Sequence, residues 1–313
     1  MLLILKGLPP VNPRIVVTGS AGMLGAETVG ALRRAGFRAV GLSRSVMDIA
    51  RPESVRSALG AMDAVDLVIN CAAYTAVDKA ESEPGAAFAV NRDGAANLAG
   101  ECARLGIPLI HISTDYVFDG KSRLPYKEEH PVNPVNVYGL SKEQGEAAIR
   151  RGIGRHIIVR TSWLYGAGGR NFVKTILGLG MERDELRVVC DQHGCPTWSS
   201  DLADCLVRLA EGVSGNSGGV GWGTYHFCGK GVATWYEFAS AVLAEAQRRK
   251  PRPGGMAKVL PVATGAYPTA AARPQYSVLD CGKIEAVFGV RPPAWEKSLE
   301  RLIEELLDPD GSA

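Results

Sequence analysis

Tyr138 and Lys142 stand four residues apart in the segment YGLSK, a spacing that can do chemistry. If the segment is helical, both side chains lie on one face, because residues i and i+4 are neighbours on a helix surface. A free phenol titrates near about 10, so a neighbouring ammonium would lower the pKa of Tyr138 toward neutral pH. The phenol could then exchange a proton with a carbonyl oxygen. Such a pair also occurs often by chance, so the spacing alone is equally compatible with two residues on a helix surface that have no catalytic role.

Gly19, Gly22 and Gly25 form a second signal, with the spacing G-x-x-G-x-x-G. They follow an apolar, strand-like run and open a helical stretch that includes Met23 and Leu24. Backbone without side chains lets a pyrophosphate approach the unpaired N–H groups of a helix N-terminus. The pattern predicts that these five residues bind a dinucleotide. The alternative is a tight strand-to-helix turn that binds nothing.

The residues after the second predicted strand indicate which dinucleotide is used. NAD enzymes usually place an acid there for the ribose hydroxyls, whereas this chain has Ser43 and Arg44, which suit a 2′-phosphate. NADPH is therefore favoured, although NADH stays open and Arg44 could be a plain solvated charge. Asp48 could receive the adenine amino group or cap the next helix. Asp48 and Ile49 are both counted with the cofactor site.

Strand-like and helical runs alternate along the first half of the chain. Such alternation is typical of parallel strands joined by right-handed crossovers, and it predicts an α/β fold with a Rossmann-type doubly wound sheet. The helical runs include residues 84–105 and 134–149. The expected strands are residues 14–18, 39–42, 66–70, 109–113 and 157–160.

The length suits one large domain or two unequal ones. We predict an NAD(P)-binding Rossmann domain over residues 1–165, in which residues 1–13 are an N-terminal extension. Beyond it the alternation loosens. Residues 166–313 are predicted to form mainly a smaller α/β substrate-binding lobe, with parts that return to the Rossmann sheet.

Composition excludes several classes of protein. The 313 residues have a formal net charge of +2 and are 46% hydrophobic, so no broad cationic field attracts nucleic acid or membrane. Seven cysteines, an odd number without a CxxC pair, favour a reducing compartment and hence the cytoplasm. The cysteines and histidines between residues 190 and 228 match no common zinc spacing, so no metal site is expected.

Six further stretches make the chain similar to a known family. Together with the glycine turn, they resemble the extended short-chain dehydrogenase/reductase family, and most closely its reductases of nucleotide-linked 4-keto-6-deoxy sugars. The stretches are NCAAYTAVDKAESEP (70–84), ISTDYVFDG (112–120), PVNVYGLSKEQGE (134–146), VRTSWLYG (159–166), DQHGCPT (191–197) and AYPTAAARP (266–274).

The resemblance implies roles for individual residues. Thr114, Tyr138 and Lys142 would be the catalytic triad, with Tyr138 as proton donor and Lys142 also holding the nicotinamide ribose. Trp163 and Arg273 would face the nucleotide-sugar, although Trp163 could be a packing residue and Arg273 a surface salt bridge. Tyr138 and Lys142 would also touch the cofactor, together with Cys71, Ala72, Ala73 and Tyr74. The substrate side would comprise Thr75, Val77, Thr114, Asp115, Tyr138, Trp163, Gln192 and Arg273.

The activity that the resemblance implies is the NADPH-dependent reduction of the C4 ketone of dTDP-4-dehydro-L-rhamnose to dTDP-L-rhamnose. It would supply cell-surface polysaccharide biosynthesis in the cytoplasm, with a dTDP-sugar as partner molecule and a homodimer allowed. Related dehydratases carry an Asp-Glu pair after the catalytic Thr, whereas here Asp115 is followed by Tyr116. Epimerases of the family retain NAD, which Arg44 disfavours.

Two alternatives stay open. One is a reductase of a sibling dTDP-4-keto-deoxysugar, because the shape of the sugar pocket decides which sugar is reduced. The other is a noncatalytic NADP-binding protein similar to the regulatory subunit of methionine adenosyltransferase, which shares the fold and many motifs. The intact Thr114, Tyr138 and Lys142 favour an enzyme.

Overall fold

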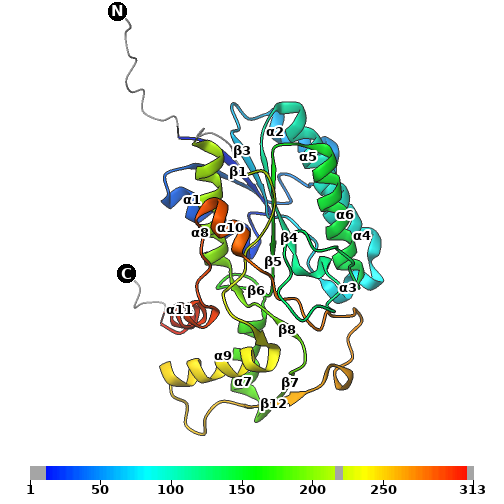
Figure 1. Cartoon of the computed structure of the whole chain (residues 1–313). Helices are drawn as coiled ribbons and strands as arrows, with labels where there is room; N and C mark the ends of the chain where they lie inside the picture. Colours follow the sequence, from blue (N-terminus) through cyan, green and yellow to red (C-terminus); the bar gives the residue numbers. More distant parts are fainter. Residues whose placement is uncertain (1–11, 216–220, 309–313) are drawn as a thin grey trace, which may run out of the picture.

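A six-stranded, all-parallel sheet forms the centre of the protein in the computed structural model, which describes residues 12–215 and 221–308 (Figure 1). The strand order is β10-β5-β4-β3-β1-β2, so the order reverses between β1 and β3. The predicted Rossmann-type doubly wound sheet is confirmed. Residues 1–11 of the predicted N-terminal extension lie outside the described residues. The strands are β1 (Arg14–Thr18), β2 (Arg38–Leu42), β3 (Leu67–Asn70), β4 (Leu109–Thr114), β5 (His156–Thr161) and β10 (Gly223–His226).

Helices cover both faces of this sheet (Figure 1). Successive strand residues point to opposite faces. Ile15 and Val17 therefore pack with α1, α8 and α10, while Val16 packs on the other side with α2, α5 and α6. All three side chains are fully buried, which explains why the strands read as continuous apolar runs. These helices are α1 (Met23–Arg34), α2 (Pro52–Gly60), α5 (Gly94–Leu105), α6 (Val137–Gly152), α8 (Ser199–Ser214) and α10 (Gly282–Phe288).

The helix predicted over residues 84–105 contains an irregular turn. It is built of α4 (Pro84–Phe88), a π-helical turn at Ala89–Asp93 and α5. A π turn inserts one extra residue and changes where the following side chains point. Here it directs Asn91 inward, against α6.

A second, smaller group of elements lies below the sheet in Figure 1. β7 (Glu185–Val189) and β12 (Lys258–Val262) pair in parallel, and α7 (Phe172–Glu182), α9 (Trp235–Arg249) and α11 (Trp295–Leu307) share one apolar core with them. Two further short pairs are β6 (Leu164–Tyr165) with β9 (Thr197–Trp198), and β8 (His193–Gly194) with β11 (Ala233–Thr234). Short helical segments complete the chain at α3 (Val77–Ser82), η2 (Asp115–Val117) and η3 (Thr264–Ala266).

The second half of the chain contributes to both groups. β10 pairs with β5 at the edge of the large sheet, and α8 packs against α1. Within the described ranges, no helix is long and apolar enough to cross a membrane.

Candidate active site

The predicted catalytic residues line one cavity at the carboxyl ends of the strands. β1, β3 and β4 are neighbours, and ligands of open α/β sheets bind where such strands end beside a switch in strand order. A cavity of about 510 Å³ opens there, lined by Gly22 and Gly25 together with Thr114, Tyr138 and Lys142. The fold thus brings the two sequence signals into one site, although they lie far apart in the chain.

The start of α6 positions Tyr138. Asn136 is the N-cap, and its side chain accepts a hydrogen bond from the Gly139 N–H at 2.7 Å. A Cβ on Gly139 would stand 2.1 Å from the Tyr116 carbonyl oxygen, so glycine lets the helix approach η2 closely. The Tyr138 ring then packs edge-on to Tyr116, with centroids 5.8 Å apart.

The pKa of Tyr138 differs from the prediction. Burial raises it to about 12, and a hydrogen bond with Thr114 opposes the rise only in part. The prediction that Lys142 lowers this pKa is wrong for this structure. The physical reason is that the buried phenol loses its hydration and lies near the Asp115 carboxylate, while Lys142 Nζ donates to the Ile112 carbonyl oxygen at 2.6 Å.

Lys142 itself is only 2% exposed, which is unusual for a lysine. Burial lowers its pKa to about 8, and the negative charge of Glu146, one helical turn further on, opposes that decrease. Glu146 is fully buried and accepts two hydrogen bonds from Arg160 of β5, at 2.9 and 2.7 Å. This ion pair holds α6 against the sheet behind the lysine.

Thr114 ends β4 and caps η2. Its hydroxyl accepts a hydrogen bond from the Tyr116 N–H at 3.2 Å and donates to Asp115 Oδ1 at 3.0 Å. Burial raises the pKa of Asp115 to about 7. Thr114 and Asp115 both line the catalytic cavity, as the resemblance implies.

The glycine turn leaves room for a dinucleotide. Gly19 has φ +65°, and a Cβ there would stand 2.7 Å from the Ala72 backbone. A Cβ on Gly25 would stand 2.2 Å from the Gly19 carbonyl oxygen. Gly22 is the N-cap of α1 and provides no side-chain cap, so the first N–H groups of the helix stay available to a phosphate. Glycine at positions 19 and 25 therefore allows the close turn that brings the helix N-terminus to the predicted cofactor site.

A neighbouring cavity of about 260 Å³ continues from this turn. Arg44 reaches it with a guanidinium that is 81% exposed and whose Nε lies 3.4 Å from Asp48 Oδ2. Asp48 also accepts the Ala50 N–H at 3.1 Å, a local turn contact, while Arg51 rather than Asp48 is the N-cap of α2. The cavity lining includes Gly19, Gly22, Arg44, Asp48, Ile49, Cys71, Ala72, Ala73 and Tyr74.

The remaining predicted cofactor residues lie around these cavities. Met23, Leu24 and Cys71 line the catalytic cavity. The Ser43 hydroxyl is 2.8 Å from that of Ser45, beside Arg44.

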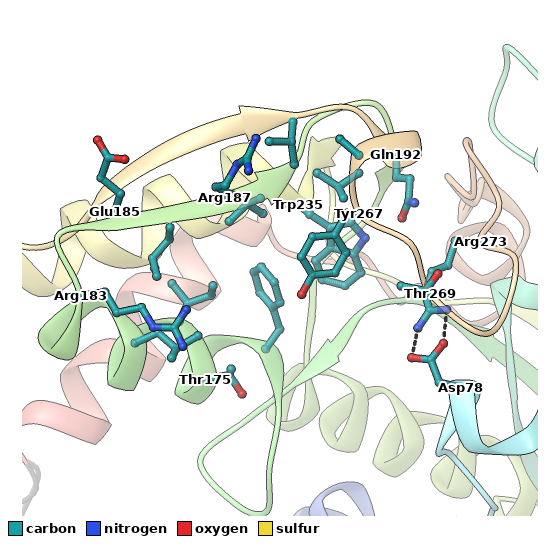
Figure 2. A pocket seen from close by; sticks show the side chains of 18 residues that line it. Asp78, Thr175, Arg183, Glu185, Arg187, Gln192, Trp235, Tyr267, Thr269 and Arg273 are labelled. Carbon is teal, nitrogen blue, oxygen red and sulfur yellow. Dashed lines mark hydrogen bonds and ion pairs between the residues drawn. The ribbon is translucent and has the colours of Figure 1, made fainter.

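A third and larger cavity, of about 740 Å³, lies in the second group of elements (Figure 2). Gln192 and Arg273 lie at one end of it, and Arg183 with Glu185 at the other (Figure 2). Its walls also include the aromatic residues Phe172, Trp235 and Tyr267.

The structure joins Arg273 to a partner within the chain. Its guanidinium forms two hydrogen bonds with the Asp78 carboxylate, at 2.8 and 2.7 Å (Figure 2). This pair links α3 to the loop after β12. Gln192 Nε2 donates to Thr264 Oγ1 at 3.1 Å.

Trp163 stands between the catalytic cavity and the larger one. It lines the first, and it stacks on Trp235 of the second with ring centroids 3.5 Å apart and a 6° interplanar angle. Its φ of +44° is rare for a bulky residue, and such backbone strain clusters at functional sites. A Cβ on Gly194 would overlap the Trp163 indole, so this position needs glycine.

Thr75 and Val77, two of the predicted substrate residues, differ from each other in their positions. Thr75 lines the catalytic cavity. Val77, the first residue of α3, is not among the residues that line these three cavities, so the structure does not bring it to them.

Sequence reasoning missed several polar residues behind the site. Asn91 of the π turn bonds the backbone of Tyr74 on one side and Ser141 Oγ on the other, at 2.9 Å. Asn70, His111 and Glu146 are equally buried. Asn70 at the end of β3 and His111 within β4 are polar residues in otherwise apolar strands, which was the available signal for these two.

Comparison with known proteins agrees with the geometry of the site. The model of the RmlD substrate binding domain family matches residues 13–307. The chain is 44% identical to a dTDP-4-dehydrorhamnose reductase of Sinorhizobium fredii, over 94% of this chain and 98% of that protein. It is 40% identical to the spore coat polysaccharide biosynthesis protein SpsK of Bacillus subtilis, over 93% and 97%.

A solved structure superposes on most of the chain. It is a dTDP-4-dehydrorhamnose reductase of Bacillus anthracis in complex with NADP, with a TM-score of 0.86 and 36% identity over 94% of this chain and 100% of that one. A dTDP-glucose 4,6-dehydratase and two UDP-glucose 4-epimerases also superpose, at 18–21% identity, which shows the shared fold alone. The chain therefore belongs to the RmlD substrate-binding-domain family, the family of the dTDP-4-dehydrorhamnose reductases.

Proposed function

We propose that this chain reduces the C4 ketone of dTDP-4-dehydro-L-rhamnose to dTDP-L-rhamnose with NADPH. The observation that carries the proposal is the meeting of Thr114, Tyr138 and Lys142 with the glycine turn in one cavity. Relatives that are named for this activity match nearly the full length of the chain. The product supplies polysaccharide synthesis, as the name of the SpsK relative suggests.

The cofactor, when bound, supplies a hydride to the ketone carbon. Tyr138 gives its proton to the ketone oxygen as negative charge develops there. Its raised pKa suits this direction of reaction, because it keeps the phenol protonated at neutral pH. Thr114 places its hydroxyl beside Tyr138 and holds the same oxygen, so that the charge is stabilised as it forms.

Lys142 acts behind Tyr138. Its Nζ is held in place by the Ile112 carbonyl oxygen, at the carboxyl end of β4. From there it can donate to a ribose hydroxyl and orient the ring that carries the hydride. In its charged form it also stabilises the developing oxyanion.

The large cavity is the proposed site of the nucleotide. Phe172, Trp235 and Tyr267 offer rings for stacking with a pyrimidine base. Arg183 and Arg187 have no ion pair among residues 12–215 and 221–308, so they are available to an anionic ligand. Trp163, at the junction of the two cavities, would then face the sugar.

Arg44 is the residue proposed to select NADPH. Its exposed guanidinium lines the cofactor cleft, and its one carboxylate contact, with Asp48, is long at 3.4 Å. A 2′-phosphate would provide a stronger, charge-assisted partner.

The cytoplasm is the proposed place of reaction, and all seven cysteines are free in the structure, as a reducing compartment requires. The homodimer that the sequence allows is tested by multi-angle light scattering of the purified chain.

The proposed function is tested by following NADPH absorbance with enzymatically prepared dTDP-4-dehydro-L-rhamnose. We expect turnover with this sugar to exceed turnover with other dTDP-4-keto-deoxysugars. Faster reduction of a sibling sugar would reassign the substrate. NADPH binding without turnover of any such sugar would favour the noncatalytic alternative.

A further inference from the structure

A chain of buried hydrogen bonds crosses the sheet behind Lys142. Thr18 Oγ1 donates to Asn70 Oδ1 at 2.6 Å, and Asn70 Nδ2 lies 2.8 Å from His111 Nδ1. His111 Nε2 lies 3.4 Å from Lys142 Nζ. The four residues belong to β1, β3, β4 and α6, and none is more than 2% exposed.

The orientation of the Asn70 amide is determined by its neighbours. The Ala72 N–H donates to Asn70 Oδ1 at 3.1 Å, beside the Thr18 hydroxyl. A rotated amide would place its NH₂ group against this N–H, so that two donors would face each other. Asn70 Nδ2 therefore donates to His111 Nδ1, and this nitrogen carries no proton.

The proton of His111 is then on Nε2. Burial and the neighbouring Lys142 lower the pKa of His111 well below its ordinary value, so the ring is neutral and has a single N–H. That N–H faces Lys142 Nζ. An ammonium has donors only, whereas an uncharged amine can accept this hydrogen bond and still donate to the Ile112 carbonyl oxygen at 2.6 Å.

We propose that Asn70 and His111 are positioning residues that hold Lys142 Nζ in place and weaken its hold on its proton in the free enzyme. This inference deepens the proposed function and rests on it. The active form keeps the proton on Lys142, and the relay brings the loss of that proton to solvent closer to neutral pH than it would be for an ordinary lysine.

Other groups that face Lys142 act with or against this relay. Glu146 on α6 favours the charged form, but its carboxylate is already engaged by Arg160. Burial raises the pKa of the Cys71 thiol, after β3, to about 12, so the thiol is neutral. Tyr138 on α6 is also neutral near pH 7. His111 on β4 is thus the group whose single proton decides which form of the amine is hydrogen-bonded.

The first experiment reads the tautomer directly and needs no turnover. In protein labelled with ¹⁵N-histidine, long-range ¹H–¹⁵N correlation distinguishes the two neutral tautomers, and a His111→Gln spectrum assigns the signal among the five histidines. We expect the His111 proton on Nε2 from pH 6 to pH 9. A proton on Nδ1 would overturn the proposal, whether or not the chain reduces the proposed sugar.

The second experiment follows kcat/KM against pH, which reports the free enzyme. Activity of the wild type should fall as the pH rises through the pKa of Lys142, about 8. In His111→Gln, the amide oxygen can face Lys142 Nζ as an acceptor. In Asn70→Asp, the carboxylate can accept a hydrogen bond from a proton-bearing Nδ1 of His111, which leaves His111 Nε2 as the acceptor toward Lys142 Nζ. Both should move this limb upward by about one pH unit, because hydrogen bonding to the charged form favours that form.

His156→Gln is the matched control. His156 is a buried histidine at the opposite end of neighbouring β5, where its Nδ1 contacts the Ile153 carbonyl oxygen. This variant should leave the limb in place. An unmoved limb in folded His111→Gln and Asn70→Asp would refute the bias on Lys142, and if neither variant folds, the wild-type tautomer decides.

Discussion

The catalytic cavity and the large cavity meet at the Trp163–Trp235 stack. They differ in whether their polar groups already have partners within the protein. Around Lys142, donors and acceptors are already bonded to one another across β1, β3, β4 and α6. In the large cavity, Arg183 and Arg187 have no ion pair within the described ranges, and they line the same cavity as Phe172, Trp235 and Tyr267. The hydrogen-bond network behind Lys142 is therefore complete before any ligand binds, whereas the large cavity keeps two arginines available to a ligand.

This difference follows from burial. A buried polar group without a partner is costly, so the groups behind Lys142 must satisfy one another. Groups on the wall of an open cavity keep their hydrogen bonds to water, so they need no partner within the protein before a ligand binds. Variants on the catalytic side should therefore change kcat or the free energy of unfolding, and variants on the other side should change KM.

Tyr138→Phe should give the largest effect. It removes the proposed proton donor and keeps the ring that packs on Tyr116. We expect kcat to fall about 10³-fold with KM nearly unchanged, since general acid catalysis contributes rate rather than ground-state binding. NADPH absorbance measures both. Tyr225 lies on β10, away from the site, and its hydroxyl donates to the Gly221 carbonyl oxygen, so Tyr225→Phe should retain activity. Comparable turnover in Tyr138→Phe and this control would remove Tyr138 from the mechanism.

Glu146→Gln tests the built network through stability. It leaves the buried Arg160 without its charged partner, so we expect the free energy of unfolding to fall by about 3 kcal/mol in urea titrations at pH 7. Folding lowers the pKa of Glu146 from 4.5 to about 2, so its contribution is complete above about pH 4.5 and is lost as the pH falls through 2. The difference from wild type should shrink in that window. A difference that grows in acid would show that the charge pair is not its source.

Trp235→Ala tests the recognition side. It removes one wall of the large cavity and the ring on which Trp163 stacks. We expect KM for the dTDP-sugar to rise about tenfold, with a smaller change in kcat, because an aromatic contact supplies binding energy. Tyr236→Ala, the next residue of α9 and not part of the cavity lining, is the control. A loss confined to kcat would place Trp235 on the chemical side of the comparison.

Arg44→Ala should give the smallest effect, because its guanidinium is largely exposed to water. We expect KM for NADPH to rise about fivefold and KM for NADH to stay nearly constant, since only NADPH carries the 2′-phosphate. Arg51→Ala removes another exposed arginine nearby, one that is paired with Glu53, and should change neither value. Equal increases for both cofactors would contradict the assignment of Arg44.

The features that could be predicted from the sequence are local in the chain. Gly19, Gly22 and Gly25 mark a turn because their backbone must pass close to neighbouring atoms, and the spacing of Tyr138 and Lys142 is set by the period of a helix. The strands can be recognised as continuous apolar runs because both faces of the sheet are covered. The π turn at Ala89–Asp93 carried no such signal, since its stability depends on the contacts of Asn91 with Tyr74 and Ser141.

The amino-acid order alone determined the glycine turn and the pairing of a phenol with an amine, because each depends on neighbours within a few residues, and its alternation of strand-like and helical runs indicated the parallel sheet. Only the tertiary structure decided that His111 and Asn70 stand behind Lys142, that Trp163 stacks on Trp235, and that Arg273 pairs with Asp78. It also reversed the expected shift in the pKa of Tyr138. Such contacts depend on strand order, register and loss of water on burial, which no short stretch of sequence encodes.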